Sequence, residues 1–189
     1  MRDAGDITRF IEARPEMMRQ LATVAALGLP AAWIGAGFIR NAVWDALHGS
    51  EAAGPAGDVD VVYFDAADLA PERDLAAEAR LRRTVPAVDW SVKNQARMHL
   101  RNGDPPYRDV ADALRHWPET ATAIAARLGD GGVELLAPYG VGDLLGLVAR
   151  PTPPFAARVA KMEIYRERVR DKGWRQRWPR LTVLDAEPI

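Results

Sequence analysis

Two aspartates, Asp58 and Asp60, stand two residues apart in the segment DVDVVYF, residues 58–64. The segment is rich in β-branched and aromatic residues, which predicts a β-strand. Side chains alternate across a strand, so both carboxylates lie on one face, ~6.6 Å apart at a rise of ~3.3 Å per residue. The other face presents apolar side chains to a core: Val59, Val61 and Tyr63. The chain therefore needs a sheet with one buried face and two repelling carboxylates on the other.

A divalent cation would relieve the repulsion between these carboxylates. Mg²⁺ suits them because it takes oxygen ligands and is commonly shared with substrate phosphates. A lone pair of aspartates in a strand can also be solvated without any metal. Other residues of the chain are needed to distinguish these two interpretations.

A third carboxylate stands in a second predicted strand, AVDWSVKNQ, residues 87–95. Alternate positions there are polar (Asp89, Ser91, Lys93) and apolar (Val88, Trp90, Val92). If this strand lies beside the first, Asp89 joins Asp58 and Asp60 in a three-carboxylate metal cluster. The Lys93 ammonium then lies on the same face, available to a phosphate. The alternative for Asp89 is a salt bridge.

A glycine turn and an arginine precede the aspartates. Residues 31–35 predict a short buried strand, and Gly37 opens a helix with Arg40 in its first turn. A helix amino terminus after a strand is a place for phosphate, and a guanidinium can add a charge-assisted contact to it. Gly35 and Gly37 could instead serve only a tight turn. The run GAGFIR alone is unspecific, because it lacks the last glycine of a dinucleotide fingerprint.

Together these stretches resemble the signature of the DNA polymerase beta-like nucleotidyltransferases. That signature is a glycine pair, then [DE]-h-[DE], then h-[DE]-h, where h is apolar. Its three parts match Ala36-Gly37-Phe38-Ile39-Arg40-Asn41, Asp58-Val59-Asp60 and Val88-Asp89-Trp90. The nearest local parallel is the Gly-Gly-x-x-Arg-Asp form of CCA-adding enzymes, from which the chain departs at Ala36 and Asn41. Over most of its length, including WSVKNQARMH (90–99) and ETATAIAARL (119–128), the chain is similar to an uncharacterised bacterial branch of nucleotidyltransferase family proteins.

The resemblance implies transfer of a nucleotidyl group from an NTP to an acceptor hydroxyl, with release of pyrophosphate. It implies catalysis and metal binding by Asp58, Asp60 and Asp89, with Mg²⁺ as the metal and Mn²⁺ as an alternative. It also implies a nucleotide- and phosphate-binding set: Gly35, Ala36, Gly37, Arg40 and Lys93. It does not supply the preferred NTP or the acceptor, for which a small molecule, RNA and a protein all stay open.

Charge is distributed unevenly along the 189 residues. The formal net charge of −1 argues against a general attraction to nucleic acid. Residues 158–180, however, hold nine Lys/Arg against three acids. This basic segment, with Trp174 and Trp178, could bind nucleic acid by charge and stacking. We favour another interpretation, in which the long basic side chains of this segment cover apolar surface and the two tryptophans belong to the core. A catalytically silent nucleotide- or metal-binding module is the other alternative function, with Ala36 as its hint.

Composition also bears on location. The chain has no cysteine, which excludes disulfides and thiolate metal sites and fits a cytoplasmic protein. Residues 21–39 carry no charge over a length that could span a bilayer, but Gly28-Leu29-Pro30 interrupts them. We interpret them as a helix that ends at Gly28, followed by a buried strand, and expect no membrane partner. The amino terminus lacks the basic region of a signal peptide.

The predicted fold is α/β (α+β): a small mixed sheet that carries the acidic residues, flanked by helices, with a helical carboxyl-terminal portion. We expect a single domain over residues 1–189, with a core of about 15–137 and a helical part of about 138–189. In the longest predicted helix, 155–170, four apolar residues face inward: Phe155, Val159, Met162 and Val169. Other helices are predicted at 6–13, 15–28, 71–84, 94–100, 108–115, 119–128 and 140–148, with a last strand at 133–136.

Overall fold

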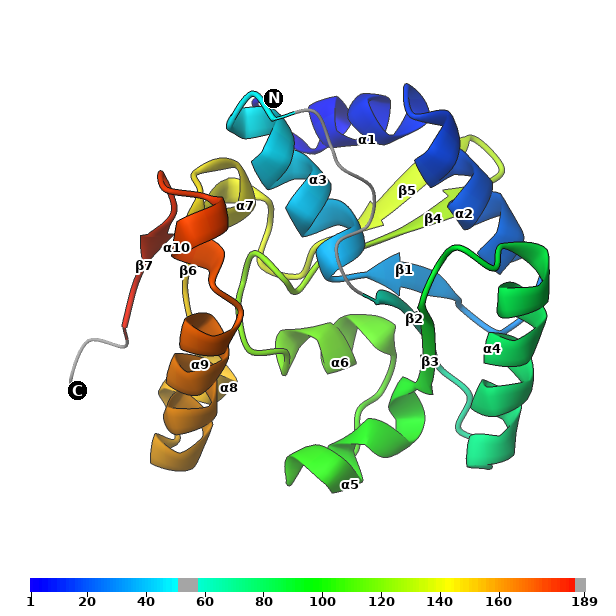
Figure 1. Ribbon diagram of the computed structural model, residues 1–189. Helices are drawn as coiled ribbons and strands as arrows, with labels where there is room; N and C mark the ends of the chain where they lie inside the picture. Colours follow the sequence, from blue (N-terminus) through cyan, green and yellow to red (C-terminus); the bar gives the residue numbers. More distant parts are fainter. Residues whose placement is uncertain (51–57, 186–189) are drawn as a thin grey trace.

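The computed structural model of the chain describes residues 1–50 and 58–185 and has the mixed α/β architecture that the sequence predicts (Figure 1). Its strands are β1 (Trp33–Gly35), β2 (Val59–Tyr63), β3 (Trp90–Asn94), β4 (Ala125–Gly129), β5 (Gly132–Leu136), β6 (Val148–Ala149) and β7 (Thr182–Val183). Its helices are α1 (Ala4–Glu12), α2 (Pro15–Ala25), α3 (Gly37–Leu47), α4 (Pro71–Thr84), the 3-10 turn η1 (Gln95–Arg97), α5 (Met98–Asn102), α6 (Val110–Arg115), α7 (Gly142–Leu145), α8 (Pro153–Ala156), α9 (Val159–Asp171) and α10 (Trp174–Arg177).

A mixed sheet of five strands, in the order β3-β2-β1-β4-β5, forms the centre of the molecule. The pair β2–β3 is parallel, whereas β1 runs antiparallel to both β2 and β4, and β4 runs antiparallel to β5. The two strands predicted to carry carboxylates are therefore neighbours. Their register places Asp60 opposite Ser91.

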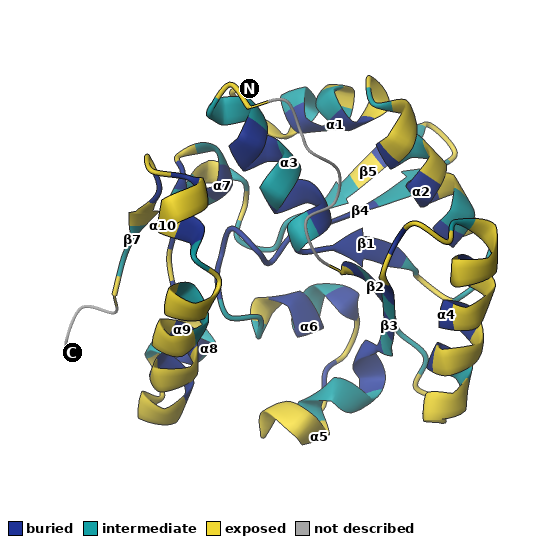
Figure 2. Cartoon of the chain, viewed as in Figure 1, coloured by how far each residue is buried: buried dark blue, intermediate teal, exposed yellow. Residues whose placement is uncertain are grey.

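Alternation along β2 sends its side chains to two different cores. Val59, Val61 and Tyr63 are fully buried in the main core, with residues of α1, α2 and α4. Val62 points the other way and packs with Trp33 and with Val110 and Leu114 of α6. Asp60 shares parity with Val62, so its carboxylate lies on the face that α6 partly covers. Figure 2 shows the buried strands between helices whose outer faces are exposed.

The predicted helix over residues 119–128 is wrong. In the structure residues 119–124 form turns that lead into β4, which pairs with both β1 and β5. Every residue from Glu119 to Ala126 is buried, so this segment has no solvent-facing side of the kind an amphipathic surface helix needs. Only residues 125–129 form a strand, and pairing with β1 and β5 on its two sides makes it a central one.

The long helix predicted at 155–170 is broken into α8 and α9. Phe155 and Met162 are buried as expected, but Val159 is 78% exposed and Tyr165 is buried instead. Beyond α9 the chain returns to the amino-terminal half. Trp174 and Trp178 meet the ring of Trp44 edge-on, with centroids 5.6 and 5.0 Å away. Both are core residues, as we favoured from the sequence.

These contacts join the carboxyl-terminal elements to α3. Asp45 of α3 accepts hydrogen bonds from the Trp178 indole (2.8 Å) and from Arg177 (2.7 Å). The main hydrophobic cluster runs without a break from α1 and α2 to Trp178 and Leu181. The single domain over 1–189 stays a prediction. Among the described residues no helix is both long and apolar enough to cross a membrane.

Candidate functional site

The two aspartates of the DVD run face a small cavity. Asp58 stands immediately before β2 and Asp60 within it, and both line a cavity of about 120 Å³. The turn before α3 forms another wall through Ala36 and Gly37. The remaining lining is rich in cations and aromatic rings: Arg40, Asn41, Arg168, Lys172, Trp174, Arg177 and Trp178. Two acids thus face four basic residues across a narrow space.

Electrostatics in this cavity disfavour two ionised carboxylates. Burial and then the charge of Asp58 raise the pKa of Asp60 to about 6. Arg168, Arg40 and Lys172 oppose that shift but do not cancel it. A carboxylate near a like charge gains from any additional cation that its site can accept.

Arg40 is a buried cation beside the aspartates. Its Nη1 donates to Thr122 (2.8 Å) and its Nη2 to Asn41 (2.9 Å). Its guanidinium lies 4.5 Å from the Trp174 ring, and its buried Nε has no hydrogen-bond partner in the part of the chain that is described. Burial lowers the pKa of Arg40 to about 10. An anion in the cavity would offset the cost of keeping this charge away from water.

The turn Gly35-Ala36-Gly37 positions α3. A Cβ on Gly35 would lie 2.8 Å from the ring of Trp117, so this glycine serves close packing. Ala36 adopts a φ of +53°, a conformation that favours glycine, and its N–H donates to Ile124 O (3.0 Å). Ala36, which stands where the resembling signature has a glycine, therefore strains the turn.

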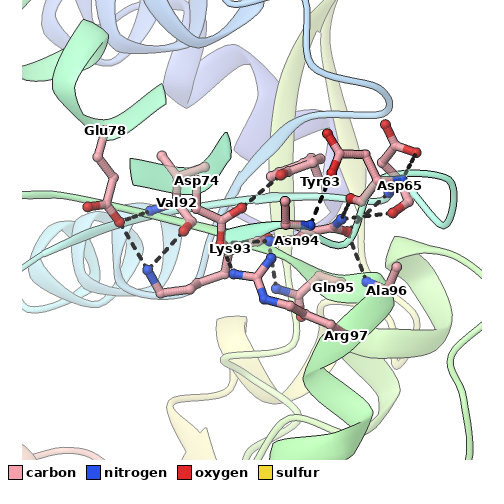
Figure 3. Close-up of polar contacts among 12 residues, drawn as sticks. Tyr63, Asp65, Asp74, Glu78, Val92, Lys93, Asn94, Gln95, Ala96 and Arg97 are labelled. Carbon is pink, nitrogen blue, oxygen red and sulfur yellow. Dashed lines mark hydrogen bonds and ion pairs between the residues drawn. The ribbon is translucent and has the colours of Figure 1, made fainter. Parts of the chain in front are cut away.

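Lys93 and Asp89 lie near the site, but the structure gives each a partner on α4. Lys93 Nζ donates to Glu78 (3.0 Å), which also accepts the Val92 N–H (2.9 Å), as Figure 3 shows. Asp89 precedes β3 beside Asp58, with its side chain 76% exposed and 3.9 Å from Arg82. No three His, Asp or Glu side chains of the described residues are grouped so that they could hold a metal.

A second, larger cavity of about 540 Å³ adjoins the first. The two share three lining residues: Ala36, Asp60 and Arg168. Its walls come from β2, β3, α5, the end of α6 and α9, and include Lys93 and Lys161. Apolar and aromatic groups such as Met98, Trp117 and Phe155 line it together with about as many polar and charged residues, so the cavity offers both kinds of contact to a small molecule.

Sequence reasoning missed the cations that α9 and the segment after it bring to the aspartates. The basic segment 158–180 was evident, but its place beside Asp58 and Asp60 was not. Arg168 and Lys172 are four residues apart and so share a helix face, which was the one signal available. Arg177 completes the set.

Comparison with known proteins shows the family of the chain. A family model described as "Nucleotidyltransferase" matches residues 22–183. The chain belongs to this nucleotidyltransferase family. The predicted family and enzyme class are thus confirmed. A search of curated proteins gave no match.

Solved structures show the same fold. A structure described as "The NMR structure of the protein reveals a CCA-adding enzyme head domain" is 33% identical, with a TM-score of 0.86, over 98% of this chain and 97% of that one. The Thermotoga maritima CCA-adding enzyme complexed with tRNA is 16% identical with a TM-score of 0.55, and a CCA-adding enzyme with CTP is 15% identical with 0.56. This chain spans 42% and 43% of those two enzymes, so the likeness concerns the fold of that part.

Proposed function

We propose that this nucleotidyltransferase is Mg²⁺-dependent and transfers a nucleotidyl group from an NTP to an acceptor hydroxyl, releasing pyrophosphate. One observation carries the proposal. Asp58 and Asp60 face Gly37, Arg40, Arg168, Lys172 and Arg177 across one small cavity. Carboxylates opposite a group of cations suit a metal–triphosphate complex, which needs both kinds of partner.

The donor set fits a divalent cation. Asp58 and Asp60 supply carboxylate oxygens, and burial together with the charge of Asp58 raises the pKa of Asp60, so a cation bound there would stabilise its ionised form. Mg²⁺ is usually held by one or two carboxylates together with substrate phosphates, so two protein ligands suffice. When bound, the cation would stabilise the charge that develops on the phosphate oxygens. Mn²⁺ has the same ligand preference and stays the alternative.

The protein's own groups would seat the triphosphate. The first N–H groups of α3 have no intrahelical partners, and the positive end of the helix dipole lies beside the aspartates. Arg40 is held rigidly by Thr122 and Asn41, so it needs little reorganisation to meet a phosphate. Lys172 and Arg177 add positive charge at the outer rim.

Two predicted residues keep more limited proposed roles. Asp89 remains our candidate for a third carboxylate on the acceptor side, but its exposed side chain suggests a weaker contribution than that of Asp60. Lys93 lines the larger cavity and would contact whatever occupies it. That cavity is large enough for a nucleoside or a small acceptor. RNA, a protein side chain and a small molecule all stay candidate acceptors, and the cysteine-free composition supports a cytoplasmic reaction.

The test is calorimetric titration of each NTP in the presence of Mg²⁺, with wild type, Asp58→Asn and Asp60→Asn. We expect wild type to bind at least one NTP, binding to require the metal, and both variants to lose it. Circular dichroism would check that the variants stay folded. Metal-independent binding, or equal binding by the variants, would contradict the assignment. Binding without pyrophosphate release over many acceptors would indicate a silent module.

A further inference from the structure

Arg168 occupies the junction of the two cavities. It reaches the site from α9, more than a hundred residues after Asp60 in sequence, yet it lines both cavities together with Asp60. Lys172 and Arg177 line the smaller cavity only, and Lys93 and Lys161 the larger one only, in the cavity linings of the described residues. Arg168 would thus contact any ligand that extends from the smaller cavity into the larger one.

A buried acid fixes this arginine. Arg168 Nε donates to Glu119 Oε1 over 2.8 Å, and Glu119 is fully buried. The other carboxylate oxygen, Oε2, has no hydrogen-bond partner among the described residues. The bond uses Nε and leaves the two terminal NH₂ groups of Arg168, to which the described part of the chain gives no hydrogen-bond partner. About 29% of the side chain is exposed.

A purely structural pair would neutralise Glu119 and do nothing else. That account leaves the position of Arg168 beside Asp60 unexplained. A buried ion pair is costly to build and often contributes little net stability, so stability alone is a weak reason for it. Holding one end of a guanidinium while its two NH₂ groups stay available is, in contrast, the arrangement that suits bidentate contact with phosphate.

We propose that Arg168 binds the phosphoryl group that is transferred, at the junction of the cavities, and that Glu119 is the residue that positions it. The inference rests on the proposed function. In the reaction the acceptor oxygen bonds to the α-phosphorus while the bond to the pyrophosphate oxygen breaks. That oxygen keeps the electron pair, and the hydroxyl proton passes to solvent. Arg168 offsets charge on the non-bridging α-oxygens throughout.

The test separates the α-phosphate from the outer phosphates. Affinities for the NMP and for the NTP of the preferred base are measured with Mg²⁺ for wild type, Arg168→Lys and Lys172→Ala. Arg168→Lys keeps a cation beside Glu119 but loses the bidentate fork. We expect it to weaken NMP and NTP binding by a similar factor, about tenfold, as loss of one charge-assisted hydrogen bond implies. Lys172→Ala should weaken NTP binding and leave NMP binding near wild type.

Two further variants serve as a control and as a test of the role of Glu119. Arg170→Lys, on the exposed side of α9, is the matched control and should bind both ligands like wild type. Glu119→Gln should weaken both ligands at least as much as Arg168→Lys, because the Glu119 charge also acts on Arg40, and the double variant should fall short of the sum of the two single losses, because Glu119 and Arg168 act as a pair. A merely structural Glu119 would give additive losses. Thermal unfolding checks the fold of each variant.

The outcomes distinguish the two proposals. NMP binding by Arg168→Lys at the wild-type affinity would overturn this inference, as would a loss confined to the NTP, which would place Arg168 with Lys172 on the outer phosphates. Either result would leave the proposed function intact. Absence of Mg²⁺-dependent NTP binding by the wild type would overturn both.

Discussion

The strand that carries the aspartates and the helices that carry the cations are built in opposite ways. Strand β2 is central, and three of its side chains are fully buried, so backbone pairing on both sides fixes Asp60. Helix α9 lies at the surface, and most of its residues are exposed (Figure 2). The acidic half of the site is therefore rigid by construction, whereas the basic half depends on how the carboxyl-terminal segment docks.

That docking depends on a few contacts with α3. Trp174 and Trp178 pack on Trp44, and Asp45 accepts two hydrogen bonds from Arg177 and Trp178. The same helix α3 supplies Gly37 and Arg40 to the cavity. A single helix thus connects the acidic strand to the basic segment. Changes in β2 should therefore alter the chemistry of the site, and changes at the docking contacts should alter stability first.

The largest effect is expected at the rigid half. Asp60→Asn should lower the rate of pyrophosphate release by about 10²–10³-fold, the range for removing one preorganised electrostatic group. Asp89→Asn should lower it by about tenfold or less, because the Asp89 side chain is exposed and its nearest cation is Arg82. Steady-state rates for both variants measure the contrast. Equal losses would show that Asp89 is a full member of the carboxylate set.

Loss of the hydrogen bond between Trp178 and Asp45 should give the largest change in stability. Trp178→Phe keeps an aromatic ring but removes the N–H that Asp45 accepts, and it should destabilise the protein by about 1–3 kcal/mol because a buried carboxylate oxygen loses its donor. Urea unfolding measures the change. Trp174→Phe is the matched control: this indole also meets Trp44 edge-on but has no hydrogen bond of its own in the described chain, so it should lose less. The reverse order would show that ring packing, and not Asp45, holds the segment.

Asp60 should also make the free energy of unfolding depend on pH. The pKa of Asp60 is raised to about 6, so the folded protein binds that proton more tightly than the unfolded chain, and stability falls as the pH rises from about 4 to about 6 and stays at the lower value above it. In metal-free buffer Asp60→Asn should therefore be more stable than wild type at pH 7.5, by about 1–2 kcal/mol. This lies below the ~3 kcal/mol that two pKa units represent, since solvent reaches part of the carboxylate.

The difference between Asp60→Asn and wild type should shrink as the pH falls through 6 toward 4. Urea unfolding at several pH values with a chelator present measures it. Asp89→Asn, at an exposed carboxylate, is the control and should change stability little at any pH. A constant difference for Asp60→Asn would mean that its effect has nothing to do with ionisation.

The smallest effect concerns the turn that joins the two halves. Ala36 holds a φ of +53°, so Ala36→Gly should remove backbone strain and stabilise the fold by about 1 kcal/mol, after the greater flexibility of glycine in the unfolded chain is counted. Thermal unfolding measures it. NTP affinity should stay within about twofold, because the path of the turn is unchanged. A loss of stability would show that the Ala36 methyl contributes packing that outweighs the strain.

Local patterns accounted for most elements near the aspartates. The helix predicted at 71–84 has those bounds as α4, because Pro71 starts it and its first turn is acidic and its last turn basic. Alternation in DVDVVYF predicted the buried side chains of Val59, Val61 and Tyr63, but not the burial of Val62 against α6 on the opposite face. The helix predicted at 119–128 failed because residues 125–129 pair with β1 and β5 as strand β4, and pairing with strands distant in the chain is not encoded in the segment itself.

By itself, the sequence determined the carboxylate pair, the glycine turn with Arg40, and through them the nucleotidyltransferase family, because each of these depends on residues a few positions apart. Only the tertiary structure decided which cations face Asp58 and Asp60, since Arg168, Lys172 and Arg177 reach them by packing across a hundred residues of chain. It also directed Lys93 to Glu78 and exposed Asp89. Spacing fixes the face of a strand on which a side chain lies, whereas packing fixes what that side chain meets.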